Sequence, residues 1–399
     1  MTRRAALILL ALGALAAPAE AAPPPPPVPN ADAAIVVDGR GGGPMFRKKA
    51  TEHRSIASTT KLMTALLTLE RTRPREVFTA ADYTAAPVES QIGLRPGEPM
   101  RVGDLFKALL LESANDAAAT LATGISGSVD EFVADMNERA EELGLDDTSY
   151  ANPIGFDDPR QYSTASDLAE LALELLRRPR FARVVDMPEA ELASGARPRV
   201  VENRNTLVAE YPFVSGVKTG HTLGAGYVLV GAAKGRGGAR VISVVMGEPS
   251  EAARDADTLA LLRWGLGQFH RVRVIDADRT MARADIEYRD ERVALVPARD
   301  AVITLRHGER VRRRVKAPDE LEGPLPAGER VGSMSVFVDG RRVRRIGLIT
   351  ATDVPGAGTA RVFFSVIGVP LTVLLVLAIL LGAALVALRL RVRLRLVRR

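Results

Sequence analysis

Three short elements of this 399-residue chain carry residue types that can perform nucleophilic catalysis. The first is Ser58-Thr-Thr-Lys61, in which a hydroxyl lies three residues before an amine. Residues three apart on a helix share a face, so Lys61 can reach the Ser58 hydroxyl and take its proton. The other two elements are Ser113-Ala-Asn115 and Lys218-Thr-Gly220. Together they predict a serine nucleophile with a lysine as its general base.

Lysine is a rare cation in this chain, because only seven of its 54 basic residues are Lys. An arginine keeps its proton in a protein, whereas a buried lysine beside another cation can lose it. Two of the seven, Lys61 and Lys218, fall within the three elements. To act as a base near neutral pH, Lys61 needs a pKa well below its usual value of about 10.4. Burial and the charge of Lys218 would both lower that pKa.

The composition excludes several other kinds of chemistry. The chain has no cysteine, which rules out thiol nucleophiles, disulfides and thiolate metal sites. Its histidines, His53, His221, His270 and His307, are far apart and form no zinc-binding motif, so we expect neither a metal nor a cofactor. The net charge of +6 comes from the two ends, since six arginines lie in residues 389–399. The rest is nearly neutral, so no nucleic-acid partner is expected.

The two ends of the chain have the patterns of a secretion signal and a membrane span. Residues 1–21 combine two arginines with an apolar run and small residues, which predicts a signal peptide. A proline-rich linker follows at residues 22–32. Residues 362–388 form an uncharged stretch that is long enough for a transmembrane helix. Residues 389–399 form a basic tail. By the positive-inside rule the tail is cytoplasmic and the preceding domains lie outside the cell membrane.

Between these ends, the hydrophobic pattern divides the chain into two domains. Residues 33–271 mix helical spacing with short buried strands, and Tyr227–Val230 with Val241–Val245 are expected to pair. Residues 272–352 alternate in short strands with turn residues, as in a small all-β domain, and residues 353–361 form a linker. The turn pair Asp339-Gly340, between strands expected at residues 335–338 and 341–346, predicts a hairpin. The predicted fold class is α+β, with a β-rich domain and a transmembrane helix behind the catalytic domain.

Four stretches carry a resemblance to a known family: Ile56–Thr64, Leu109–Ala118, Asn152–Asp157 and Gly216–Thr222. They are similar, in order and spacing, to the D-alanyl-D-alanine carboxypeptidases of the type-5 low-molecular-mass penicillin-binding proteins. The resemblance implies a β-lactamase/transpeptidase-like catalytic domain, with helices on both faces of an antiparallel sheet. It also implies removal of the terminal D-alanine from peptidoglycan stem pentapeptides. β-Lactam antibiotics would then be covalent inhibitors.

The resemblance assigns the catalytic roles residue by residue. Ser58 would be the nucleophile, Lys61 its base, and Ser113 a relay for protons. The backbone N–H groups of Ser58 and His221 would form the oxyanion hole, which stabilises the charge that develops on the attacked carbonyl oxygen. No metal takes part in this scheme.

The resemblance also assigns the groups that bind the substrate. Asn115 would hold a substrate amide, while Lys218 and Thr219 would bind the terminal carboxylate of the peptide. Arg204 would be a further ligand of that carboxylate. At Gly220, any Cβ would obstruct a substrate that lies alongside the strand.

Two other functions fit parts of the same pattern. A β-lactamase shares the three elements, but no Glu-x-x-Leu-Asn segment lies between Asn115 and Lys218 to activate a deacylating water. The other is a catalytically idle penicillin-binding scaffold, against which the intact Ser58, Lys61 and Ser113 argue. A spanning helix also departs from the amphipathic C-terminal helix that is usual in the family.

Overall fold

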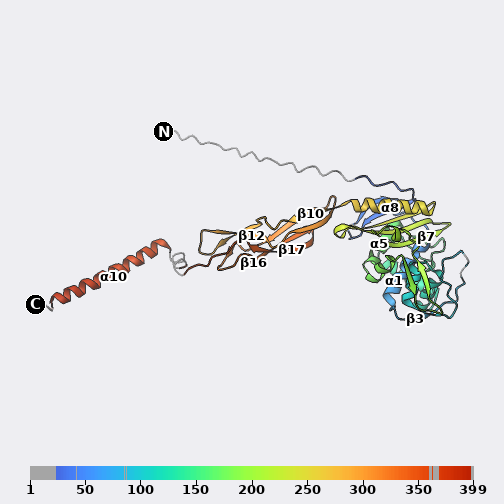
Figure 1. Ribbon diagram of the computed structural model, residues 1–399, viewed down its shortest axis with the longest axis horizontal. Coiled ribbons are helices and arrows are strands. Elements are labelled where there is room, and N and C mark those ends of the chain that lie inside the picture. Colours follow the sequence, from blue (N-terminus) through green and yellow to red (C-terminus); the bar gives the residue numbers. More distant parts are fainter. Residues whose placement is uncertain are drawn as a thin grey trace, which may run out of the picture. The chain divides into compact units, whose positions relative to one another are not determined.

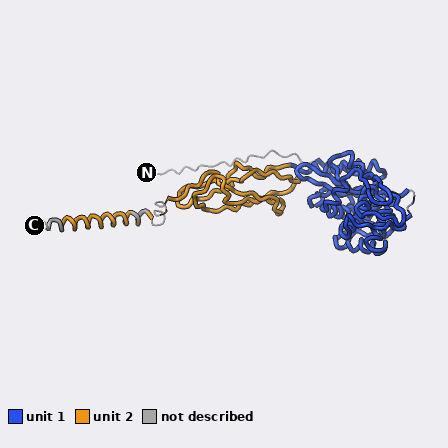
Figure 2. The backbone as a smooth tube through the Cα atoms, turned by 60° about the horizontal axis from the view of Figure 1, so that its bottom comes forward, with its two compact units in different colours: residues 1–270 blue, residues 271–399 orange. Residues whose placement is uncertain are grey.

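The computed structural model describes residues 24–396, apart from positions 42, 85, 87, 359–361 and 363–367. The predicted signal peptide therefore lies outside the described residues. The chain divides into two compact units, residues 1–270 and residues 271–399 (Figure 2). The first unit contains a sheet with many helices, whereas the second consists of strands followed by one long helix, α10 (Figure 1).

A five-stranded antiparallel sheet in the order β2-β1-β9-β8-β7 forms the centre of the first unit. The predicted pairing of two buried strands is confirmed, because β8 and β9 pair with Val230 opposite Val244. β7 lies at the edge of the sheet and carries the Lys218 element. The strands are β1 (Ala33–Asp38), β2 (Pro44–Lys48), β7 (Val214–Thr222), β8 (Gly226–Lys234) and β9 (Arg240–Glu248).

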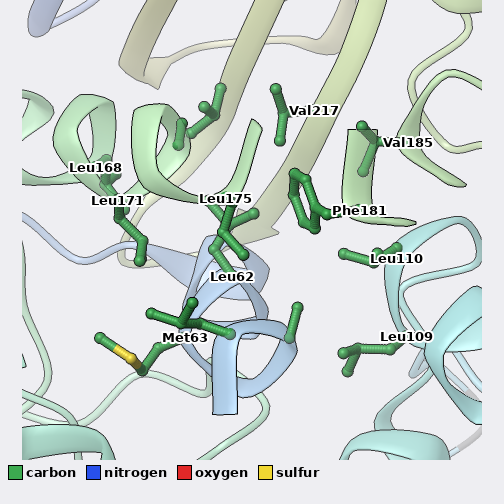
Figure 3. Close-up of a cluster of buried hydrophobic side chains, with 14 of the residues drawn as sticks. Leu62, Met63, Leu109, Leu110, Leu168, Leu171, Leu175, Phe181, Val185 and Val217 are labelled. Atoms are coloured by element: carbon green, nitrogen blue, oxygen red, sulfur yellow. The ribbon is translucent and has the colours of Figure 1, made fainter. Parts of the chain in front are cut away.

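Helices cover both faces of this sheet because its inner strands are apolar on both faces. Ile35 and Val37 of β1 belong to the core beneath α1 and α5, whereas Ala34 and Val36 belong to the core beneath α8. Figure 3 shows the first of these cores. The helices of this unit are α1 (Lys61–Arg71), α2 (Val102–Leu110), α3 (Asn115–Ser126), α4 (Val129–Glu142), α5 (Ala165–Leu176), α6 (Pro179–Val185), α7 (Leu207–Glu210) and α8 (Glu251–Gly267).

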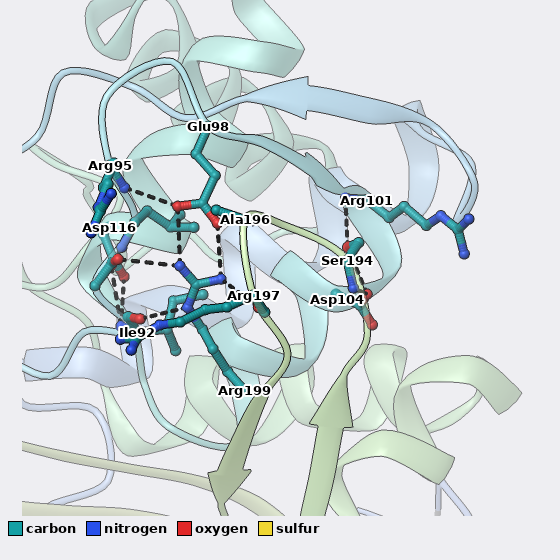
Figure 4. Close-up of polar contacts among 12 residues, drawn as sticks. Ile92, Arg95, Glu98, Arg101, Asp104, Asp116, Ser194, Ala196, Arg197 and Arg199 are labelled. Atoms are coloured by element: carbon teal, nitrogen blue, oxygen red, sulfur yellow. Dashed lines mark hydrogen bonds and ion pairs between the residues drawn. The ribbon is translucent and has the colours of Figure 1, made fainter.

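Two short hairpins lie outside the central sheet, and a buried ion pair joins them (Figure 4). They are β3 (Val77–Thr79) with β4 (Pro99–Arg101), and β5 (Glu189–Leu192) with β6 (Arg199–Glu202). Glu98 lies 2.9 Å from the Arg199 guanidinium, and both side chains are buried. Burial alone raises the pKa of Glu98, but hydrogen bonds from Arg199 and from main-chain N–H groups lower it to about 2. The segment before β4 is therefore firmly attached to the β5–β6 hairpin.

The second unit contains a six-stranded sheet in the order β14-β16-β17-β12-β11-β15 and a separate β10–β13 pair. The predicted hairpin at Asp339-Gly340 is confirmed, and both residues have the left-handed φ that such a two-residue turn needs. The strands are β10 (Phe269–Ile275), β11 (Ala282–Ile286), β12 (Arg292–Pro297), β13 (Ala301–Arg306), β14 (Val311–Lys316), β15 (Glu320–Leu321), β16 (Arg330–Val338) and β17 (Arg341–Thr350).

The C-terminal helix α10 is described from Val369 to Leu396. Its segment Val373–Arg391 is long and apolar enough to cross a membrane. The helix continues through the arginines expected to form the tail, so residues 389–396 are helical rather than extended. The part of α10 before Arg389 consists mainly of leucine, valine and alanine, a composition typical of a transmembrane helix.

Candidate active site

Ser58 lies in a 3₁₀ turn, η1 (Ala57–Thr60), which leads directly into α1. The sequence pattern placed it at the start of the α-helix, but that helix begins at Lys61. Ala57 has a left-handed φ of 45°, so the chain turns sharply just before the serine. The hydroxyls of Thr59 and Thr60 donate to Ile56 O and Ala57 O at 2.6 and 2.8 Å. These bonds hold the serine in place.

The amino group of Lys61 is buried among three polar neighbours. Its Nζ lies 3.0 Å from Ser58 Oγ, 2.6 Å from Asn115 Oδ1 and 2.6 Å from the carbonyl oxygen of Ile154. Burial lowers the pKa of Lys61 well below its usual value, and the charge of Lys218 lowers it further. The carboxylates of Glu89 and Asp116 act in the opposite direction.

These contacts determine where the lone pair of a neutral Lys61 points. A neutral amine has two hydrogens and one lone pair. The carbonyl oxygens of Asn115 and Ile154 can only accept, so they take both hydrogens. The lone pair then faces Ser58, whose hydroxyl can donate to it. The geometry is that of a general base within reach of the proton that it removes.

The Ile154 carbonyl is presented by a tight turn at residues 152–157. The Asn152 side chain accepts hydrogen bonds from the N–H groups of Gly155 and Phe156 at 2.7 and 3.1 Å. Gly155 has a φ of 100°, and a Cβ there would lie 2.1 Å from Ala57 O. Only glycine therefore lets this turn approach the serine. Because the contact uses the main chain of Ile154, the identity of its side chain does not affect the hydrogen bond.

A carboxylate fixes the orientation of the Asn115 amide. Asn115 Nδ2 donates to Glu89 Oε2 at 2.8 Å, so its Oδ1 is left to accept from Lys61. Glu89 also accepts from the Tyr83 hydroxyl and from the N–H of Ala86. Burial raises the pKa of Glu89, but the hydrogen bonds from Tyr83 and Asn115 outweigh it and hold the pKa below its usual value. The carboxylate is therefore ionised at neutral pH.

Ser113 lies in the connection between α2 and α3, two residues before Asn115. Its φ is 63°, which is uncommon for a residue other than glycine. Its Oγ is buried and has no hydrogen-bond partner among the residues that the structure describes. A buried hydroxyl without a partner is costly, so this atom is available to a substrate or a water molecule.

Lys218 is the second buried lysine of the site. Its Nζ donates to the carbonyl oxygen of Thr219 at 3.0 Å. Burial, followed by the charges of Arg204 and Arg254, lowers the pKa of Lys218 to about 7. An incoming carboxylate would stabilise the charged form of this amine, so carboxylate binding and proton uptake are coupled here.

β7 brings Lys218, Thr219 and Gly220 past the nucleophile. A Cβ at Gly220 would lie 3.0 Å from both the Ala57 Cβ and the Ser58 nitrogen. The sequence analysis explained this glycine by a substrate beside the strand, whereas its neighbour in the structure is the serine's own turn. His221 extends from the strand and stacks on Tyr227, with ring centroids 4.0 Å apart.

Arg204 is near this group but is already paired. Its guanidinium forms an ion pair with Glu112, and the arginine side chain is more than half exposed. It lies close enough to Lys218 for its charge to lower that pKa. The structure therefore brings all nine predicted residues to one region, with Arg204 at its periphery. A serine enzyme with a lysine base is the class that this site defines.

Comparison with known proteins identifies the family. A family model described as D-alanyl-D-alanine carboxypeptidase matches residues 19–250, and one for the C-terminal domain of penicillin-binding protein 5 matches residues 269–356. The carboxypeptidase DacF of Bacillus subtilis is 31% identical over 338 residues, which are 82% of this chain and 87% of the relative. The chain belongs to the D-alanyl-D-alanine carboxypeptidases, a family of serine enzymes. The resemblance found in the sequence is confirmed.

Solved structures show the same fold. Penicillin-binding protein 5 from Haemophilus influenzae has a TM-score of 0.59 at 29% identity and covers 84% of this chain and 99% of its own. The Streptomyces K15 DD-transpeptidase has a TM-score of 0.57 at 30% identity, but covers 60% of this chain and 98% of its own. The transpeptidase-like catalytic domain followed by an all-β domain is thus confirmed.

Sequence reasoning missed Glu89 and Tyr83. Both lie in a segment without helical or strand periodicity, and 25 residues separate Glu89 from Asn115. It also gave no role to Asn152 or Gly155, although both were part of the resemblance. The one available signal was Gly155 itself, since a glycine directly after a proline-containing turn often has a conformation closed to other residues.

We expect Glu89→Gln to change the pH dependence of acylation. Removing this charge should lower the pKa of Lys61, so the acid limb of the acylation profile should move to lower pH. The plateau rate should fall about tenfold, because the Asn115 amide is no longer held in one orientation. Stopped-flow acylation by a fluorescent penicillin at a series of pH values measures both effects.

Two control variants separate this effect from general damage. Tyr83→Phe keeps the Glu89 charge, so its acid limb should stay close to that of the wild type while its plateau falls. Glu76→Gln changes an exposed carboxylate outside the site and should alter neither quantity. A lower plateau in Glu89→Gln without displacement of the limb would mean that Glu89 supports only the local structure.

Proposed function

We propose that this enzyme removes the terminal D-alanine from peptidoglycan stem pentapeptides through an acyl-enzyme on Ser58. The observation that carries the proposal is the hydrogen bonding of Lys61, which leaves its lone pair directed at the Ser58 hydroxyl. The D,D-carboxypeptidase names of the relatives support the substrate. No metal or cofactor is needed for this chemistry.

Acylation proceeds by attack of Ser58 Oγ on the carbonyl carbon between the last two D-alanines. The serine proton passes to Lys61 as the carbon–oxygen bond forms. The backbone N–H groups of Ser58 and His221 stabilise the oxyanion. When the carbon–nitrogen bond breaks, the proton passes through Ser113 to the departing amine of D-alanine. Water then attacks the ester, Lys61 accepts its proton, and that proton passes to Ser58 Oγ as the bond between the acyl carbon and the serine oxygen breaks.

Lys218 makes the reaction specific for the end of a peptide. A substrate that lies along the open edge of β7 extends the sheet by one strand. Its terminal carboxylate then meets Lys218 and Thr219, with Arg204 nearby, while Asn115 holds its amide. Because the pKa of Lys218 is about 7 in the free enzyme, the amine is mostly neutral above neutral pH. Binding of the carboxylate is then accompanied by uptake of a proton on Lys218.

We further propose that α10 anchors the enzyme in the cytoplasmic membrane by a single span. The apolar segment Val373–Arg391 supports the span, and the arginines that end it support a cytoplasmic C-terminus. The first unit and the strands of the second unit then lie outside the membrane, where the signal peptide predicted at residues 1–21 would direct them. Peptidoglycan is the substrate available there.

We expect the purified enzyme to release free D-alanine from a pentapeptide ending in D-Ala-D-Ala. A fluorescent penicillin should label it covalently, and Ser58→Ala should lose both labelling and D-alanine release because the ester oxygen is missing. Thr59→Ser, in the same turn, is the matched control and should retain both. Labelling of the Ser58→Ala variant would refute the assignment of the nucleophile.

Adding a D-amino acid to the same assay distinguishes hydrolysis from transpeptidation. The K15 relative is named as a transpeptidase, and an amine acceptor would replace water at the ester. We expect the free tetrapeptide to remain the main product. A product dominated by the exchanged pentapeptide would overturn the carboxypeptidase assignment while leaving the acyl-enzyme intact.

The topology is tested by protease added to intact spheroplasts that express the full chain with an epitope after Arg399. Both folded units should be digested, and the epitope should survive because it lies inside. Permeabilised cells provide the control, in which the epitope should also be lost. Digestion of the epitope in intact spheroplasts would refute the proposed orientation.

A further inference from the structure

Three adjacent strands of the second unit, β14, β16 and β17, carry nine basic residues and no carboxylate. The ion pairs described in this unit join Arg273 with Asp300, Arg289 with Glu291 and Arg292 with Asp285, outside these strands. The positive charge of the three strands is thus uncompensated among the described residues. The nine are Arg312, Arg313, Arg314, Lys316, Arg330, Arg341, Arg342, Arg344 and Arg345.

Strand register collects most of these residues on one side of the sheet. Alternate residues of a strand share a face, which groups Arg312, Arg314 and Lys316. Ser335 pairs with both Arg314 and Arg345, and so places them in one row. Phe337 pairs with both Arg312 and Arg342, which places these two in a second row. Lys316 and Gly347 both pair with Ser333, and the Arg330 side chain lies over Gly347 in this third row. We call this set the basic face: Arg312, Arg314, Lys316, Arg330, Arg342 and Arg345.

Neighbouring side chains and main-chain atoms keep the basic face ordered. Arg314 lies over the Phe337 ring, 5.5 Å from its centroid, and Arg345 donates to Ser333 Oγ at 3.3 Å. Lys316, Arg330 and Arg345 line a hollow of about 470 Å³, whose lining residues include no carboxylate. Such a hollow can accept an anionic group the size of a phosphate, which arginine binds through paired N–H donors.

Protection of a sheet edge explains the presence of charge here, but not its collection on one face. Basic residues on an edge strand prevent pairing with other chains, which would account for β14. Arg330, Arg342 and Arg345 belong to β16 and β17 but lie outside the stretches that pair with β14 and β12, so edge protection applies to them as well. Edge protection does not require their side chains to share one face with those of β14, as the register shows that they do. Like charges in neighbouring rows also destabilise a sheet, so their retention points to an external anion.

The position of this domain in the chain identifies the source of the anion. Only 18 residues separate Thr350, the last residue of β17, from Val369, the first of α10. A fully extended linker of that length spans roughly 60 Å, so the domain cannot move far from the membrane that α10 enters. Lipid headgroups of the outer leaflet are therefore present at high local concentration, and anionic headgroups among them attract Lys and Arg within a Debye length of about 8 Å.

We propose that the basic face docks on the anionic phospholipid headgroups of the membrane in which α10 is anchored. The proposal rests on the anchor proposed above, and it adds a second, electrostatic contact to that anchor. Docking would restrict the movement of the strands of the second unit relative to α10. It requires no change at the active site, so carboxypeptidase activity towards a soluble pentapeptide is independent of it.

The absence of cysteine from the chain allows a direct test. Ser335→Cys, labelled with a donor dye, places the probe between Arg314 and Arg345. The full chain is reconstituted into vesicles of phosphatidylglycerol or phosphatidylcholine that contain an acceptor lipid, and energy transfer is measured. We expect transfer in phosphatidylglycerol to be at least about twofold higher, and to fall to the phosphatidylcholine level at high salt.

A matched pair of charge reversals locates the effect. Replacing Arg312, Arg314 and Arg345 by Glu should reduce transfer in phosphatidylglycerol to the phosphatidylcholine level. Replacing Arg271, Arg279 and Arg299 by Glu changes the net charge equally at exposed positions off the basic face, and should leave transfer high. Both triple variants should release D-alanine from a soluble pentapeptide as the parent does, which shows that the first unit is intact. Their far-ultraviolet circular dichroism should match that of the parent, which shows that the strands of the second unit are folded.

Three results would overturn the proposal, and they differ from a failure of the function. Equal transfer in the two lipids, or equal loss in both triple variants, would refute docking by the basic face. Displacement from phosphatidylglycerol vesicles by an equal phosphate concentration of soluble poly(glycerol phosphate) would assign the face to a wall polymer instead. A chain that does not float with either vesicle would refute the anchor, whereas absence of D-alanine release would refute only the proposed reaction.

Discussion

The active site depends on keeping the amino group of Lys61 buried without its proton. An ammonium in this position would be costly, because it lies away from solvent and near the charge of Lys218. The neutral amine instead satisfies both of its hydrogens on the carbonyl oxygens of Asn115 and Ile154. The lone pair of the neutral amine is then left to face Ser58, whose Oγ lies 3.0 Å from Lys61 Nζ. The catalytic geometry follows from this one set of hydrogen bonds.

Several segments that are distant in the sequence position the hydrogen-bond partners of Lys61. The turn at residues 152–157 can present its carbonyl only because Gly155 has no Cβ to collide with the serine turn. Glu89 holds the Asn115 amide in the one orientation that turns its oxygen to Lys61. The main chain just beyond Glu89 is in turn held by Asp116, which accepts hydrogen bonds from Ile92 and Leu94 (Figure 4). The turn η1 and the helix α1 that follows it fix the spacing of Ser58 and Lys61.

The sequence predicted the fold class and the principal site residues because both leave local patterns. The spacing of Ser58 and Lys61 and the rarity of lysine identified a catalytic pair. Short apolar runs identified β8 and β9, and alternation around the Asp339-Gly340 turn identified β16 and β17. Glu89 could not be found in this way, because its contact with Asn115 is formed by tertiary packing of an irregular segment. The contact of Gly220 with the serine turn could not be found for the same reason, since sequence spacing does not reveal that β7 passes that turn.

Titration of the lysine side chains by NMR tests the central claim most directly. The chain has seven lysines, so ¹³Cε labelling gives few signals, and Lys61→Arg and Lys218→Arg assign the two of interest. The account predicts that the Lys61 signal titrates well below the usual value, and that the Lys218 signal titrates near pH 7. A Lys61 signal that keeps the chemical shift of an ammonium up to about pH 10 would contradict it, because the lysine could then not accept the serine proton at neutral pH.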